Sequence, residues 1–163
     1  MKAICLSDIH GNDVKYRKLC GYIKQTLPDA VFIAGDVLPN YYVTEPLEFI
    51  DDTLKPLLSD LKEEMKQAYP DIFLITGNDD AAVSCEHLRY LELKGLIHFA
   101  NKLVMDQKGY TVLGYPYVPP TPFLLKDWEK YDVSRYLPRD TVSPEDGIRT
   151  VDVPANIKKY TTI

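Results

Sequence analysis

The sequence predicts an α/β protein, because short apolar runs alternate with stretches of helical periodicity. Three compact apolar runs, at residues 3–6, 30–33 and 72–75, have the length and composition of buried strands. Between them, apolar residues recur at the three- and four-residue steps typical of amphipathic helices. Strands that alternate with helices favour a sheet whose strands run parallel.

Helix signals divide the first half of the chain. We expect a helix over residues 14–26, capped by Asn12 or Asp13, because both side chains can accept a hydrogen bond from a first-turn amide. A long helical pattern follows over 46–68, and Pro56 inside it predicts a kink or a split.

The third run is followed by a further helix and then by short strands. Asp80 is a candidate cap for a helix that extends to about residue 94 and ends at Gly95. Short strands are expected at 97–99 and 103–105, and a turn at Lys108-Gly109 predicts a hairpin into 110–115. The chain is thus predicted to be mixed, with parallel strands first and antiparallel strands later.

The last quarter of the chain differs from the rest. Prolines interrupt it repeatedly and periodic apolar runs are few. We therefore expect a single domain over 1–163, with an α/β core at 1–117 and a Pro-rich extended loop or lid at 118–163. No internal repeat accompanies this change of composition.

Composition and charge exclude several classes of function. The net charge of −5 argues against broad binding to nucleic acid or to an anionic membrane. No window reaches the ~20 apolar residues of a membrane span, and the start of the chain has no apolar leader, so we expect a cytoplasmic protein. The three widely spaced cysteines do not favour a disulfide framework.

Polar motifs directly follow the three predicted strands. They are Asp8-x-His10, Gly35-Asp36 and Gly77-Asn78-Asp79-Asp80. The carboxyl ends of parallel strands meet at one edge of a sheet, so Asp8, His10, Asp36 and Asn78 are expected to converge there. A mixed set of Asp, His and Asn suits Mn, Fe, Zn or Ni better than Ca, whose ligands are oxygens.

Each motif also has an ordinary structural explanation. Aspartate is a frequent turn former and helix cap, and a lone loop histidine is commonly just polar. For any one motif we would favour that explanation. Their joint position after successive strands favours the metal site.

The ordered series Asp8-x-His10, Gly35-Asp36 and Gly77-Asn78-x-Asp80 resembles the first three signature blocks of the calcineurin-like metallophosphoesterase family. The resemblance covers about residues 1–117. It implies a layered α/β sandwich with a mixed sheet, two divalent metal ions, and phosphoester hydrolysis by a metal-bound hydroxide. By the same resemblance Asp8 and His10 hold the first metal, Asp36 bridges, and Asn78 binds the second metal and the phosphate.

The sequence departs from the family pattern at two places. Asp79 stands where the third block usually has a proton-donating histidine, so Asn78 and Asp79 are the candidate catalytic residues here. The later histidine blocks of the family are missing, since His87 and His98 come too early in the chain. We therefore expect an incomplete dinuclear site, with fewer ions than in the family, in a domain that lacks the C-terminal part.

Two kinds of function remain open from the sequence. The first is a metal-dependent phosphoesterase, using manganese or a similar ion, that acts on a phosphodiester or a small phosphate ester. The second is a non-catalytic scaffold of the same fold that binds a partner. A third possibility is that the chain is a fragment; the loss of a second half would expose the sheet edge, so a homo-oligomer or a complementing polypeptide is expected.

Overall fold

The structure is a computed structural model that describes residues 1–42, 45–101, 104–107, 109–131 and 136–152. Its centre is a four-stranded sheet in the order β1-β2-β3-β4, and every neighbouring pair is parallel. The strands are β1 (Ala3–Leu6), β2 (Ala30–Ala34), β3 (Asp71–Ile75) and β4 (His98–Phe99). The predicted α/β class is confirmed, and so are the three apolar runs as its first three strands.

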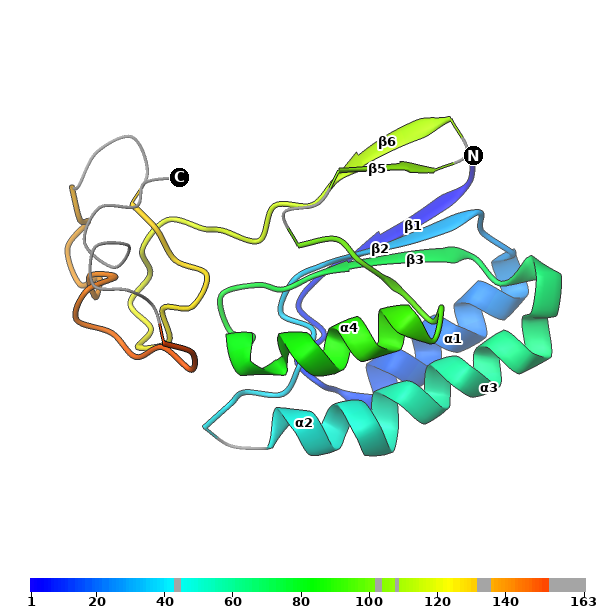
Figure 1. Cartoon of the computed structure of the whole chain (residues 1–163), viewed down its shortest axis with the longest axis horizontal. Coiled ribbons are helices and arrows are strands. Elements are labelled where there is room, and N and C mark those ends of the chain that lie inside the picture. The colour runs from blue at the N-terminus through cyan, green and yellow to red at the C-terminus, as the bar shows by residue number, and fades with distance from the viewer. Residues whose placement is uncertain (43–44, 102–103, 108, 132–135, 153–163) are drawn as a thin grey trace.

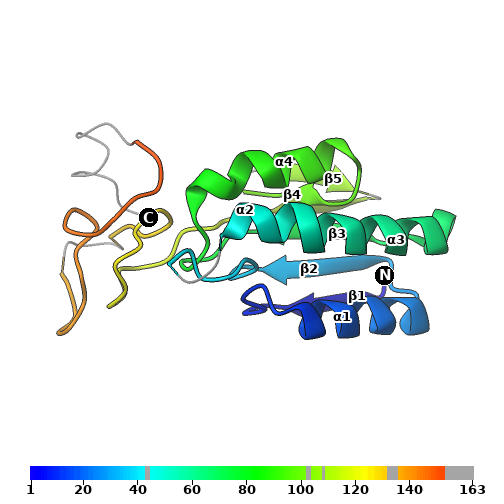
Figure 2. The same cartoon turned by 90° about the horizontal axis from the view of Figure 1, so that it is seen from below.

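All the helices lie on one face of this sheet (Figures 1 and 2). Sequential parallel strands added in one direction place each right-handed crossover on the same side, which explains the single helical layer. The helices are α1 (Asp13–Thr26), α2 (Pro46–Phe49), α3 (Lys55–Met65) and α4 (Cys85–Leu93).

The hydrophobic core fills the space between the helices and the sheet. Leucine and isoleucine side chains from α1, α3 and α4 pack there against the inner face of β2 and β3. The fully buried core residues include Ile23, Val31, Ile50, Leu54, Leu74, Leu88 and Leu91.

The long helical pattern at 46–68 is divided, as Pro56 predicted. A π-helical stretch, Ile50–Leu54, joins α2 to α3, and a 3-10 turn at Lys66–Ala68 follows α3. Proline has no N–H to donate into the preceding turn, so the backbone just before Pro56 departs from regular α-helix.

The two predicted helix caps have different outcomes. Asn12 caps α1, because its side chain accepts a hydrogen bond from the Lys15 amide at 3.0 Å. The prediction that Asp80 caps the next helix is wrong. A 3-10 turn at Ala82–Ser84 precedes α4, and Asp80 is instead completely buried.

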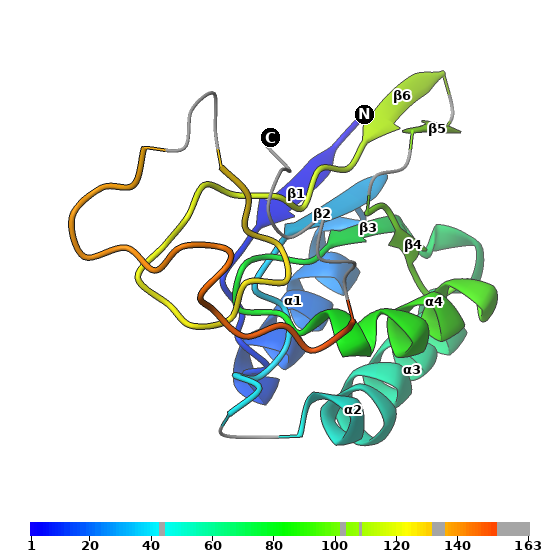
Figure 3. The ribbon, with the colours of Figure 1, turned by 60° about the vertical axis from the view of Figure 1, so that its left-hand side comes forward.

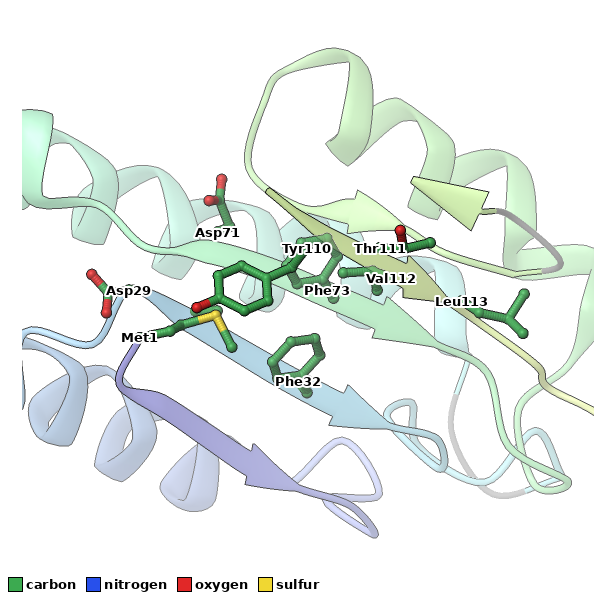
Figure 4. Close-up of a pocket in the computed structure, with 10 residues that line it drawn as sticks. Met1, Asp29, Phe32, Asp71, Phe73, Tyr110, Thr111, Val112 and Leu113 are labelled. Carbon is green, nitrogen blue, oxygen red and sulfur yellow. The ribbon is translucent and has the colours of Figure 1, made fainter. Parts of the chain in front are cut away.

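The other face of the sheet is only partly covered. A hairpin of β5 (Val104–Gln107) and β6 (Tyr110–Leu113) forms a separate antiparallel sheet over it (Figure 1), so the predicted hairpin is confirmed. A cavity of about 520 Å³ lies between β6 and the aromatic pair Phe32 and Phe73. Figure 4 shows Tyr110 and Val112 facing this sheet surface.

The chain after β6 extends beyond the carboxyl ends of the strands (Figure 3). Its described residues, 114–131 and 136–152, include no helix or extended strand, yet part of this segment is buried. The ion pair of Lys126 with Glu129, at 2.5 Å between Nζ and Oε2, is completely buried. Glu129 also accepts a hydrogen bond from the Thr121 amide at 2.8 Å.

This segment is fastened to the loop that follows β3. The Trp128 indole donates a hydrogen bond to the carbonyl of Asp80 at 2.8 Å. The Asp127 carboxylate accepts one from the Ala82 amide at 2.7 Å. The division into an α/β core at 1–117 and an extended loop or lid at 118–163 stays a prediction.

Across the described residues, no helix is long and apolar enough to cross a membrane.

Replacing Lys126 by Met tests the buried ion pair. The variant leaves Glu129 buried without its cation, so the free energy of unfolding should fall by about 3–5 kcal/mol. Lys24→Met is the matched control, since it removes the exposed Lys24–Glu64 pair and should leave stability nearly unchanged. Urea denaturation followed by circular dichroism measures both, and equal midpoints would contradict the expectation.

Candidate functional site

Three loops leave the carboxyl ends of β1, β2 and β3 at the same edge of the sheet. We call them the first loop (residues 7–12), the second loop (35–40) and the third loop (76–81). The first and second loops continue the parallel pairing of β1 and β2. The amides of Asp8, His10 and Gly11 donate hydrogen bonds to the carbonyls of Gly35, Asp36 and Val37, at 3.2, 2.8 and 3.0 Å.

The side chains of Asp8, His10 and Asp36 converge at this edge. Each offers one ligand atom, and these atoms all lie within 4.8 Å of one another. Two carboxylates and an imidazole at this separation can share one divalent cation, and this donor set suits a transition metal. Within the described residues, this is the one group of three or more His, Cys, Asp or Glu side chains that is close enough to hold a metal.

The backbone is left-handed at all three of these residues. The φ angles are 58° at Asp8, 52° at His10 and 50° at Asp36. Residues other than glycine rarely adopt a left-handed backbone conformation, because it is strained. The strain is tolerated where surrounding contacts hold the backbone in that conformation. The hydrogen bonds between the first and second loops provide that support.

A close approach of the third loop fixes the position of Asp36. A Cβ built on Gly77 would lie 2.3 Å from Oδ1 of Asp36 and 2.5 Å from its backbone nitrogen. Only glycine fits against the second loop at this point. Gly77 of the third motif is therefore required by the close packing against Asp36 as well as by the turn.

Burial governs the electrostatics of the Asp36 carboxyl. Desolvation raises the pKa of Asp36 above its ordinary value, and the nearby carboxylates of Asp79 and Asp8 add to the shift. A hydrogen bond from the Asp79 amide and the charge of His10 act in the opposite direction. A cation at this position would relieve the repulsion among the carboxylates.

Asp79 contacts two members of the cluster. Its amide donates to Oδ1 of Asp36 at 2.9 Å, and its Oδ2 lies 3.2 Å from Nδ1 of His10. The other carboxylate oxygen accepts a hydrogen bond from the Asn40 side chain at 2.9 Å. The third loop is thereby tied to both of the others.

Asp80 connects the second and third loops from beneath. Its carboxylate accepts hydrogen bonds from the amides of Val37, Leu38 and Gly77 at 3.1, 2.8 and 2.8 Å. Burial raises the pKa of Asp80 to about 7, although these donors favour the charged form. Asp80 is thus a structural residue that lies beneath the site.

The remaining candidates are placed as follows. Asn78 is half-buried in the third loop, between Gly77 and Asp79, both of which approach Asp36. His87 lies 3.7 Å from Asp51, and His98 pairs with Asp71 at 3.2 Å and stacks on Phe73. Neither histidine is a member of the cluster.

The family model described as calcineurin-like phosphoesterase matches residues 1–157. The chain belongs to this family. No curated protein matches the chain in sequence. One crystal structure is similar at 18% identity with a TM-score of 0.48, and the match covers 70% of this chain and 52% of that one. The chain thus spans about half the length of that structure.

Membership is consistent with a metal site at the cluster. Calcineurin-like phosphoesterases typically depend on divalent metals, and this chain has a candidate metal site in Asp8, His10 and Asp36. Sequence reasoning missed Asn40, whose amide donates to Asp79, and it assigned Asp80 to a cap. The contact between Asn40 and Asp79 spans 39 residues of sequence, so no local pattern indicates it.

Gly77→Ala tests the close approach of the third loop. The added methyl group must displace Asp36, so we expect the free energy of unfolding to fall by about 1–3 kcal/mol and the affinity for Mn²⁺ to fall as well. Gly21→Ala is the control, because a Cβ at that site in α1 meets nothing within 4 Å. It should stabilise the helix by roughly 0.5–1 kcal/mol without changing metal binding. Thermal denaturation and calorimetric titration measure these effects.

Asp80→Ala tests the buried connection between the loops. It leaves three amides without an acceptor, and the free energy of unfolding should fall by about 3 kcal/mol or more. Asp52→Ala removes an exposed carboxylate on the helical face and should change stability by less than about 0.5 kcal/mol. Chemical denaturation compares the two, and a tolerated Asp80→Ala would show that the loops do not depend on this carboxylate.

Proposed function

We propose that this chain is a metal-dependent phosphoesterase that hydrolyses a phosphodiester or a small phosphate ester. The observation that carries the proposal is the convergence of Asp8, His10 and Asp36 within 4.8 Å. Family membership supports the same reaction class.

In this proposal, Asp8, His10, Asp36 and Asn78 hold the divalent metal, with Mn²⁺ as the first ion to test. A bound divalent ion supplies positive charge toward phosphate oxygens and makes water a stronger nucleophile near neutral pH. The Asn78 amide offers both an oxygen ligand and an N–H donor. Its place in the third loop supports contact with the phosphate as well as with the ion.

The chain must attract an anion although its net charge is −5. Two features that follow the first loop favour this. Lys15 lies at the start of α1, with Nζ 2.9 Å from the carbonyl of Asp8. The same helix begins at Asp13, so its positive end is adjacent to the cluster.

The proposed site has fewer protein ligands than a complete dinuclear site of the family. We propose that a second copy or a complementing polypeptide supplies the rest, and that the isolated chain hydrolyses esters slowly. We also propose a cytoplasmic location, supported by the free thiols of Cys5, Cys20 and Cys85.

A non-catalytic scaffold is the second candidate, and one feature favours it. Asp79 occupies the position where the family usually has a proton-donating histidine. A scaffold of this kind would bind no metal at the Asp8–His10–Asp36 cluster. Metal analysis of protein prepared without chelator separates the two candidates.

The proposal is tested by Mn²⁺ titration together with hydrolysis of bis-p-nitrophenyl phosphate. Asp36→Ala should lower affinity and rate by more than the roughly 10–100-fold typical of losing a residue that only supports a ligand. Asp52→Ala, far from the cluster in sequence and exposed, should leave both unchanged. Hydrolysis that needs no added metal and survives Asp36→Ala would rule out the proposed mechanism.

A further inference from the structure

Asp79 has contacts that suggest a different role from proton donation. We propose that Asp79 is a positioning residue that holds His10 in one tautomer and one orientation, with Nε2 left free for the metal. This inference rests on the proposed function, because it concerns how the chain prepares a ligand of that site.

Both oxygens of the Asp79 carboxylate have a partner within the site, one by an ion-pair contact and the other by a hydrogen bond. Oδ2 lies 3.2 Å from Nδ1 of His10, and Oδ1 accepts from Nδ2 of Asn40 at 2.9 Å. A carboxylate whose two oxygens face the side chains of His10 and Asn40 is poorly placed to protonate a leaving group. Its contacts therefore point toward His10 and away from general acid catalysis.

The backbone of Asp79 is fixed by the same cluster. Its amide donates to Oδ1 of Asp36 at 2.9 Å, so one residue touches two members of the candidate metal site. The adjacent Asp80 carboxylate holds the loop to Val37 and Leu38. The backbone that carries the Asp79 side chain is thus held by the Asp79 amide and by the neighbouring Asp80 carboxylate.

The tautomer of His10 decides whether it can bind a metal. A neutral imidazole carries its proton on one nitrogen, and the other nitrogen has the lone pair that a metal needs. An acceptor beside Nδ1 places the proton there and leaves the lone pair on Nε2. A carboxylate in this position also makes the imidazole a stronger ligand.

Orientation is the second contribution. The His10 side chain is 43% exposed, so packing alone leaves its ring free to rotate. The contact with Asp79, itself anchored by Asn40, restricts that rotation. A ring that is already aligned loses less conformational entropy when the metal binds.

The chain offers a matched control for this pair. His98 lies 3.2 Å from Asp71, the same separation as His10 from Asp79, but His98 is not a member of the cluster. Asp71→Ala therefore removes another carboxylate–histidine contact, here a hydrogen bond at Nε2, outside the cluster. An effect specific to the metal site should appear in Asp79→Ala and not in Asp71→Ala.

The test uses the full chain and two measurements. In metal-free protein, ¹⁵N NMR of the imidazole nitrogens should show His10 with its proton on Nδ1. In Asp79→Ala the signals should shift toward a mixture of tautomers. Calorimetric titration with Mn²⁺ should show about 10–100-fold weaker binding for Asp79→Ala and unchanged binding for Asp71→Ala.

The outcomes separate this inference from the proposed function. If the wild-type chain binds no Mn²⁺, the proposed function fails, and the metal-free NMR spectrum still decides whether Asp79 fixes the tautomer. If the wild type binds Mn²⁺ and Asp79→Ala changes neither tautomer nor affinity, the inference is overturned and the proposed function stands.

A second variant covers a failure of Asp79→Ala to fold. Asp79→Asn keeps the size of the side chain, but either orientation of its amide sets an NH₂ group against one of the two donors, His10 or Asn40. We expect weaker Mn²⁺ binding with a native circular dichroism spectrum, because the neutral amide places either an NH₂ group or an uncharged oxygen beside His10 in place of the carboxylate. Wild-type Mn²⁺ affinity in this variant would overturn the inference.

Discussion

The site depends on one buried carboxylate, that of Asp80. It lies beneath the sheet edge with no exposed surface and accepts hydrogen bonds from amides of both the second and the third loop. Those amides would otherwise be buried without partners, which is costly. Because Asp80 holds Gly77 against the second loop, it also sets the distance between Asp36 and Asp79. The geometry of the candidate metal site thus depends on Asp80, a buried residue that is not itself a member of the cluster.

The sequence was sufficient for the parts of the structure that follow from local patterns. Apolar runs specified β1, β2 and β3, Asn12 specified the start of α1, and Pro56 specified the break near α3. The cluster of Asp8, His10 and Asp36 was predictable because parallel strands bring their carboxyl ends to one edge. Each of these inferences needed only the strand order and the side-chain chemistry.

The roles of Asp79 and Asp80 were not predictable, because both depend on contacts between distant segments. Asp80 follows a strand and precedes a helix, so a capping role was the simplest expectation. Its actual partners, Val37 and Leu38, lie 43 and 42 residues earlier in the chain. The sequence placed Asp79 at the motif position where the family usually has a proton-donating histidine. In the structure, the Asp79 carboxylate accepts a hydrogen bond from Asn40 of the second loop. Sequence spacing carries no information on which loop amide or side chain will face a given carboxylate.

The same arrangement that prepares the site also works against the stability of the metal-free chain. Carboxylates of Asp8, Asp36 and Asp79 lie near one another, and their repulsion adds to the burial that raises the pKa of Asp36. Three left-handed residues add backbone strain. A folded chain must offset these terms elsewhere, through Asp80 and through the core beneath the helices. Binding of a divalent cation would relieve the repulsion, so stability and metal affinity should be linked.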